Sequence, residues 1–197
     1  MMMTNEILFG KKLKENIGNL FLSSDKYENG LMVLISPFFS EPKLFDPQEI
    51  PANIFQLINL ELDLDRKIIL ITDDTNYKEK DYIEDFFKKL DEENISRNLF
   101  LFAVNNLHSK LFIKKNYAIL GSMNLTFSGI NLNKEMAVKI YENKDLNSIK
   151  AYFGYLLIES EPLNENAKKL KKWLAKQKLS NYSKKWKIYD KINDEYK

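Results

Sequence analysis

The chain has 197 residues, no cysteine and one histidine, and its formal net charge is +2 at pH 7. Lack of cysteine excludes disulfide bonds, thiolate zinc sites and a cysteine nucleophile, and a single histidine excludes metal sites that need two or three imidazoles from one chain. The length suits one domain with a helical appendage, and 44% hydrophobic with 29% charged residues is typical of a globular protein.

The first element that the sequence predicts is a helix. Apolar residues recur at helical spacing from Ile7 to Phe21. Lys11 and Lys12 interrupt this pattern, so the segment does not have the apolar core of a secretion signal. No stretch of the chain approaches the roughly 18 apolar residues of a membrane span. We therefore expect a cytoplasmic protein with no membrane partner.

Strands and helices are then predicted to alternate. Three continuous apolar runs are typical of buried strands, and they lie at residues 31–35, 67–72 and 99–104. Helical periodicity follows at 54–64 and at 80–93. Residues 37–53 contain four prolines and predict a loop, and residues 73–76 predict a turn. This alternation favours an α/β core.

After residue 104 the pattern changes to a hairpin. Residues 108–114 and 117–120 are predicted strands joined by Lys115 and Asn116, a two-residue connection that favours antiparallel pairing. Residues 135–141 predict a further strand. The expected fold is therefore an α/β fold in which a mixed β-sheet is flanked by helices on both faces.

The C-terminal part is expected to be helical and basic. Residues 146–158 predict a helix, and the segment around Pro162 suggests a boundary between a domain at 1–160 and a C-terminal helical extension at 161–197. Residues 163–197 hold 11 lysines against 4 acidic residues. Two interpretations stay open: amphipathic helices whose aromatic side chains pack on the core or on a partner chain, and a surface that contacts nucleic-acid phosphates.

The hairpin carries the residues that indicate a chemistry. His108 and Lys110 are two apart in a predicted strand, so their side chains share a face. An imidazole beside an ammonium forms a site for an anion, with lysine supplying charge and neutral histidine supplying a nucleophile or base. Strand pairing places Gly121 opposite Lys110, where we expect open space for a ligand. Ser122 and Asn124 can join this site only if the strand ends near Gly121.

This pattern of His-x-Lys followed by Gly-Ser-x-Asn resembles the signature of the phospholipase D superfamily. The matching residues are His108, Lys110, Gly121, Ser122 and Asn124. Asn133-Lys-Glu135 is similar to the Asn-x-Glu that follows the signature in the small nucleases of the family. Two departures lie at the hairpin turn: Lys115 stands where the family has an aspartate, and the spacing to Gly-Ser is one residue shorter.

The resemblance implies a role for each residue. His108 would attack phosphorus and form a phosphohistidine, while Lys110 and Asn124 would hold the non-bridging oxygens. Ser122 would bond to the phosphate or to this network, and Glu135 would accept a proton from the far ring nitrogen of a His108. The resemblance implies no metal and no other cofactor.

A second histidine is needed to protonate the leaving oxygen and then to activate water. Single-motif members of the family obtain it by pairing two chains about a twofold axis, so the resemblance implies a homodimer with one composite active site. The expected function is metal-independent cleavage of nucleic acid, DNA before RNA. Family nucleases also imply a translocase or a defence-system partner. Two alternatives stay open: a phospholipase or phosphatidyl transferase, and a catalytically degenerate nucleic-acid-binding subunit.

Overall fold

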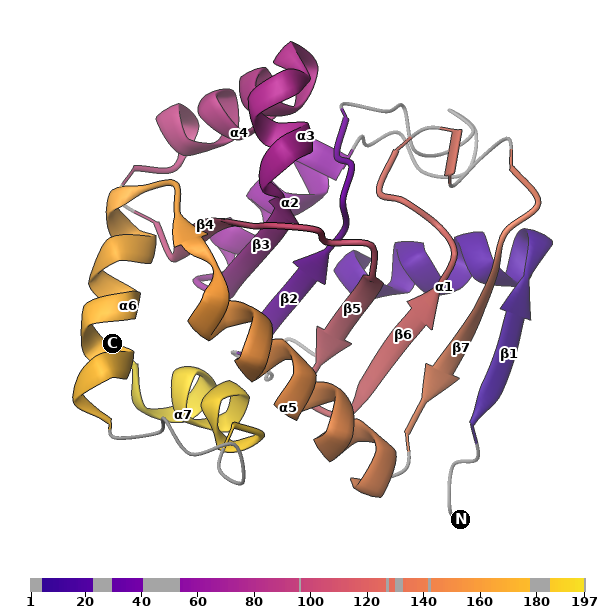
Figure 1. Cartoon of the computed structure of the whole chain (residues 1–197). Coiled ribbons are helices and arrows are strands. Elements are labelled where there is room, and N and C mark those ends of the chain that lie inside the picture. Colours follow the sequence, from indigo (N-terminus) through magenta and orange to yellow (C-terminus); the bar gives the residue numbers. More distant parts are fainter. Residues whose placement is uncertain are drawn as a thin grey trace.

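A computed structural model describes residues 5–22, 30–40, 54–95, 97–126, 128–129, 133–141, 143–177 and 185–196 of the chain. The strands of these residues form one sheet of eight in the order β1-β7-β6-β5-β2-β3-β4-β8 (Figure 1). The strands are β1 (Glu6–Phe9), β2 (Leu31–Ile35), β3 (Lys67–Asp73), β4 (Leu99–Val104), β5 (Lys110–Lys114), β6 (Tyr117–Gly121), β7 (Met136–Ile140) and β8 (Glu161–Pro162). The helices are α1 (Gly10–Leu22), α2 (Ile54–Asp63), α3 (Asp74–Glu79), α4 (Asp81–Glu93), α5 (Asn143–Glu159), α6 (Glu165–Lys176) and α7 (Lys187–Glu195).

The centre of the sheet is parallel and its edges are antiparallel. β2 pairs in parallel with β3, and β3 pairs in parallel with β4. β5, β6, β7 and β1 extend the sheet on one side with antiparallel pairs, and β8 closes the other side against β4. The continuous apolar runs of β2 and β4 are buried along their whole length. The predicted mixed sheet is confirmed.

Helices cover both faces of the sheet, as predicted. α1, α2 and α4 pack on one face, where their apolar residues join those of alternate strand positions. α5, α6 and α7 lie across the other face, in front of the sheet in Figure 1. The register places the carboxyl ends of β2, β3 and β4 beside the start of β5 and the end of β6. These strand ends together form one edge of the sheet, which runs across the strands. This edge is the upper one in Figure 1.

The predicted first helix is wrong at its beginning. Residues 6–9 form the edge strand β1, which pairs with β7, and the helix starts only at Gly10. Leu8 is fully buried while Ile7 and Phe9 are exposed, which is the two-residue alternation of a strand. Gly10 has a φ of 53°, a left-handed conformation that favours glycine and turns the chain from β1 into α1.

The predicted turn at residues 73–76 is also wrong. Asp73 is the N-cap of the short helix α3, and its side chain accepts a hydrogen bond from the backbone N–H of Asn76. Of the predicted loop at 37–53, residues 41–53 lie outside the described residues. Phe39, which precedes them, is fully buried and forms a β-bridge with Leu125.

The C-terminal helices pack directly on the sheet. Ala167, Leu170 and Leu174 of α6 are buried, and so are Ile188, Tyr189 and Ile192 of α7. The division of the chain at residue 160 stays a prediction. Among the described residues, no helix is long and apolar enough to cross a membrane.

Candidate active site

The candidate nucleophile lies in the connection between β4 and β5 rather than in the strand. β5 begins at Lys110, so the prediction of a strand from residue 108 is wrong by two residues. Asn106 adopts a left-handed φ of 58°, which bends the chain out of β4. His108 and Lys110 nevertheless lie together: Lys110 Nζ donates to the His108 carbonyl at 2.7 Å and is 3.4 Å from His108 Nδ1.

These two side chains differ in exposure. Lys110 is buried with 8% exposure, whereas His108 is exposed. Burial lowers the pKa of Lys110 below its usual 10.5, and the negative charge of Glu135 opposes this shift. An ammonium only donates hydrogen bonds, and at 3.4 Å its nitrogen faces His108 Nδ1. The pair thus presents a buried amine beside an exposed imidazole.

Ser122 and Glu135 meet beside this pair. β6 ends at Gly121, which is the condition under which Ser122 can turn toward the site. Ser122 Oγ donates to Glu135 Oε2, and Asn133 Nδ2 donates to Glu135 Oε1 at 3.1 Å. In the described part of the chain, Glu135 makes no hydrogen bond to His108. The carboxylate is therefore oriented by Ser122 and Asn133.

Gly121 does not provide the open space expected beside Lys110. It pairs with Lys110 as predicted. A Cβ at this position would lie 2.6 Å from the Met136 carbonyl oxygen and 2.7 Å from the Ala137 Cβ. The expectation of space for a ligand is wrong, because β7 fills that space; the glycine lets β6 and β7 approach closely.

Asn124 lies in the loop that follows β6. This loop is tied to the end of β2, since the N–H of Leu125 donates to Ser36 Oγ at 3.1 Å. The Oδ1 of Asn124 is buried and has no hydrogen-bond partner among the described residues. A buried acceptor without a donor costs free energy, so this loop is a place where a ligand or water can complete the hydrogen bonding.

Two residues near this edge escaped the sequence analysis. Asp73, at the end of β3, accepts hydrogen bonds from Asn76 and from Leu107, the residue before His108. Ser36, at the end of β2, holds the loop of Asn124. Aspartate is a preferred residue at the N-cap of a helix, and this preference could have predicted the bond of Asp73 with the Asn76 N–H. No sequence pattern indicates the contacts of Asp73 with Leu107 or of Ser36 with Leu125, because each joins distant segments.

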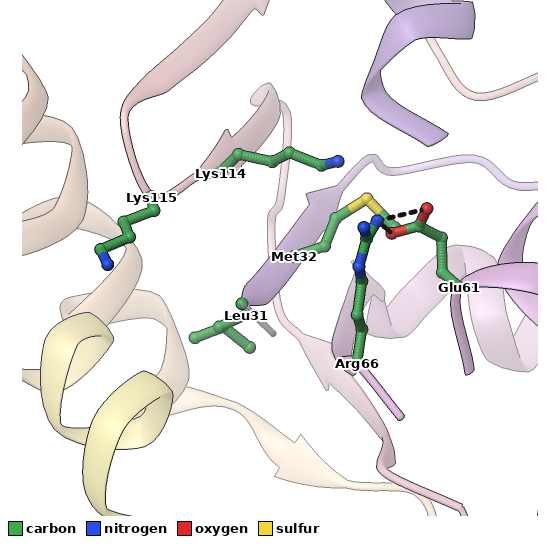
Figure 2. A pocket seen from close by; sticks show the side chains of 7 residues that line it. Leu31, Met32, Glu61, Arg66, Lys114 and Lys115 are labelled. Atoms are coloured by element: carbon green, nitrogen blue, oxygen red, sulfur yellow. Dashed lines mark hydrogen bonds and ion pairs between the residues drawn. The ribbon is translucent and has the colours of Figure 1, made fainter. Parts of the chain in front are cut away.

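The departure from the family signature lies at the other end of β5. Lys115 is exposed in the turn after β5, five residues beyond Lys110. A small pocket is found there, lined by Gly30, Leu31, Met32, Glu61, Arg66, Lys114 and Lys115 (Figure 2). Arg66 Nη1 donates to both oxygens of Glu61, at 2.7 and 2.6 Å. This cluster is separated from His108 by the length of the strand.

Comparison with known families identifies the class of protein. Residues 34–157 match the family described as cardiolipin synthase, PLD-like domain. This match spans more than half of the chain and contains His108, Lys110, Asn124 and Glu135. The chain belongs to this family, and thus to the phospholipase D superfamily, as the resemblance implied.

Solved structures with the same fold include members of the superfamily. A phospholipase D family member, Nuc from Salmonella typhimurium, matches with a TM-score of 0.61 and 14% identity, over 82% of this chain and 99% of that one. Phosphatidylserine synthase from Haemophilus influenzae matches with a TM-score of 0.65 and 17% identity, over 95% of this chain and 45% of that one. TrmBL2, an archaeal chromatin protein, matches with a TM-score of 0.53 and 14% identity, over 83% and 56%. No curated protein matches the chain.

Proposed function

We propose that this chain is a metal-independent phosphodiesterase whose substrate is nucleic acid, and therefore a nuclease. The observation that carries the proposal is the contact of Lys110 with His108, at the sheet edge where Ser122 meets Glu135. A buried ammonium, an exposed imidazole and a fixed carboxylate are the groups that phosphoryl transfer without a metal requires. Membership of the phospholipase D superfamily supports the same chemistry.

In the proposed reaction His108 attacks the phosphorus of a phosphodiester. A bond from the ring nitrogen to phosphorus forms while the bond from phosphorus to the leaving oxygen breaks, and the leaving oxygen takes a proton from a second imidazole. That second imidazole then removes a proton from water. The resulting attack on phosphorus breaks the bond to His108 and restores the free enzyme.

The neighbouring residues stabilise the charge that develops. Lys110 has three N–H donors, so it can bond to a phosphate oxygen while it keeps its bond to the His108 carbonyl. We assign the other contacts to the phosphate to Asn124 and Ser122. To Glu135, which Ser122 and Asn133 hold, we assign the role of accepting the proton of an imidazole. Since each chain has one histidine, the second imidazole has to come from a second copy of the chain.

An apolar surface next to the site supports this homodimer. Leu8 points into the core on the α1 side, so Ile7 and Phe9 point to the other face of the sheet, and their partners on β7 and β6 follow the same alternation. This apolar surface consists of Ile7, Phe9, Leu120, Met136 and Val138. Phe9 is 67% exposed and Met136 is 59% exposed. In Figure 1 none of the described helices crosses β1 or β7 on this face.

The apolar surface adjoins the candidate site. The backbone N–H of Ser122 donates to the Met136 carbonyl at 3.1 Å, and Met136 follows Glu135 in the chain. A second copy that covers this surface about a twofold axis would bring its own site close to the first. Light scattering tests the dimer. We expect Phe9→Glu to yield inactive monomers, and Leu64→Glu, an equally polar change at an exposed leucine of another face, to leave an active dimer. An active monomer would refute the two-histidine reaction.

The function itself is tested with four substrates in the presence of a chelator. Single-stranded DNA, double-stranded DNA, RNA and phosphatidyl lipid vesicles are incubated with the wild-type protein and with His108→Ala. We expect cleavage of nucleic acid that is lost in the variant. Turnover of lipid alone would refute the nuclease, and binding of nucleic acid without turnover would identify a non-catalytic binding subunit.

Two other functions have specific support. A phosphatidyl transferase is favoured by the description of the matching family as cardiolipin synthase and by the likeness to phosphatidylserine synthase over 95% of this chain. A nucleic-acid-binding subunit is favoured by the likeness to a chromatin protein. Lys169, Lys172 and Lys176 are exposed on α6 and suit contacts with phosphates. We place the nuclease first because the charged site and this basic helix agree with one substrate.

A further inference from the structure

His108 is held outside the sheet by a short connection. Between Val104 of β4 and Lys110 of β5 the chain passes through the left-handed Asn106 and then buries Leu107, which is 5% exposed, in the core under α5. His108 follows directly. The position of the imidazole therefore depends on how firmly Leu107 is fixed.

Asp73 fixes the backbone of Leu107. Its Oδ2 accepts the Leu107 N–H at 2.8 Å, while its Oδ1 accepts the Asn76 N–H at 2.9 Å. Asp73 is the last residue of β3 and pairs with Val104, so it lies beside the point where the connection leaves the sheet. The side chain is 5% exposed, and both carboxylate oxygens are occupied by backbone donors. A carboxylate that bonds charge-neutral donors in this way gives short, strong hydrogen bonds.

We propose that Asp73 is a positioning residue, which sets the location of His108 by holding Leu107; this rests on the proposed role of His108 as the nucleophile. The carboxylate is suited to this because it has two acceptor oxygens and no donor. An asparagine would turn an N–H toward one of the two backbone donors. A serine can cap α3 with its one oxygen but leaves Leu107 without an acceptor.

The same side chain connects the two halves of the site. In α3, the helix that Asp73 caps, Asn76 Nδ2 donates to the Pro37 carbonyl at 3.4 Å. Thr72 Oγ1 donates to the same carbonyl at 3.3 Å. Pro37 follows Ser36, whose Oγ holds the loop of Asn124. Movement at Asp73 would thus change the distance between His108 and Asn124, which have to contact one phosphate together.

The test compares Asp73→Ser, Asp73→Asn and the control Asp74→Asn. Asp74 carries the same charge one residue later, but its carboxylate bonds Lys78 on the surface of α3 and not Leu107. Because the chain has one histidine, the imidazole of His108 gives a single set of ring signals by NMR, which reports its surroundings without any substrate. The kinetic parameters kcat and KM are measured on whichever substrate the wild-type protein cleaves.

We expect both Asp73 variants to move the His108 ring signals and to lower kcat by about 10- to 100-fold with little change in KM. Asp74→Asn should match the wild type in all three. Unchanged ring signals and kcat in folded Asp73→Ser would overturn the proposal. If both Asp73 variants unfold, hydrogen exchange in the wild type decides, since rapid exchange of the Leu107 amide would show that Asp73 does not hold it. A wild-type protein without activity would refute the nuclease but leave the NMR result valid.

Discussion

The Oγ of Ser36 accepts the backbone N–H of Leu125 at 3.1 Å, across 89 residues of sequence. The same hydroxyl donates to the Phe38 carbonyl at 2.8 Å, and Ser36 is completely buried. The next residues extend this contact. Phe39 forms a β-bridge with Leu125, and the Ser40 N–H donates to the Leu125 carbonyl. The loop that carries Ser122 and Asn124 is therefore positioned by the end of the central strand β2.

Replacing this hydroxyl should weaken both the fold and the site. Ser36→Ala leaves the buried N–H of Leu125 without an acceptor, so we expect the free energy of unfolding to fall by about 1–3 kcal/mol. Catalysis should fall as well, because Asn124 lies next to Leu125. Denaturant unfolding and kcat measure the two effects. Ser148→Ala is the control, since Ser148 is exposed on α5 and bonds only a carbonyl of its own helix; a variant at Ser36 that behaves like this control would contradict the expectation.

The pH dependence of activity should report the charge on Lys110. Burial lowers its pKa below 10.5 and Glu135 raises it, so removing the charge of Glu135 lowers the pKa further. Activity requires the protonated lysine in our proposal. We therefore expect the alkaline limb of the pH–rate profile to lie below that of an ordinary lysine, and to move to still lower pH in Glu135→Gln.

Asn133→Ala provides the matched control for this shift. It removes the hydrogen bond to Glu135 Oε1 but keeps the carboxylate charge. Its alkaline limb should stay at the wild-type position even if the overall rate falls. A limb that moves equally in both variants would show that it reports a group other than Lys110.

Removing one partner of the buried ion pair between Arg66 and Glu61 should destabilise the fold more than removing both. The two side chains are 6% and 1% exposed. Glu61→Gln removes the charge that compensates the buried guanidinium, and we expect a loss of about 3–5 kcal/mol in the free energy of unfolding. The double variant Glu61→Leu with Arg66→Met should be much closer to the wild type.

An exposed ion pair serves as the comparison for that prediction. Asp74 and Lys78 lie on α3 at i and i+4, and the lysine is 67% exposed. Lys78→Met should change the free energy of unfolding by less than about 1 kcal/mol. Equal losses at the two pairs, measured by denaturant unfolding, would contradict a burial effect.

Lys171 should stabilise the end of α5 rather than bind a ligand. Its Nζ donates to the carbonyls of Leu157, Ile158 and Ser160, at 3.0, 2.7 and 2.7 Å. We expect Lys171→Met to lower the free energy of unfolding by about 1–3 kcal/mol without changing the affinity for DNA. Lys172 is an exposed lysine that, like Lys171, lies on α6. Lys172→Met should leave the free energy of unfolding unchanged and weaken DNA binding slightly.

The sequence was sufficient to predict the buried strands and most helices. β2 and β4 are apolar along their length, β3 is apolar from Ile68 to Ile71, and α4 carries Ile83, Phe86 and Leu90 on one face. The pairing of Lys110 with Gly121 followed from the two-residue turn between the strands. β1 was missed because its apolar residues also fit the helical spacing of α1, and only the pairing with β7 decides between the two.

The contact between His108 and Lys110 was predictable from the sequence, but most of the geometry around it was not. The spacing of His108 and Lys110 predicted that the two lie together, and they are in contact. That Ser122 and Asn124 belong to the same catalytic site stays a prediction. The spacing of the motif has limits. It could not show that β7 fills the space at Gly121, because that depends on a strand 15 residues further along. The contacts that hold the site, from Asp73 to Leu107 and from Ser36 to Leu125, join segments that are 34 and 89 residues apart. Such contacts follow from the topology of the sheet and leave no local pattern.

The helix α7 completes the beginning of β2. Asn193 Oδ1 accepts the Leu31 N–H at 2.6 Å, Tyr189 donates to the Leu31 carbonyl at 2.5 Å, and Lys67 Nζ donates to the Ile192 carbonyl at 3.0 Å. During synthesis, the ribosome releases β2 and β3 long before residues 187–195. Until α7 leaves the ribosome, the N–H and the carbonyl of Leu31 therefore lack these partners and are open to water. We expect chains arrested before Lys187 to be digested by proteases, so that the protein matures only after translation has passed this helix.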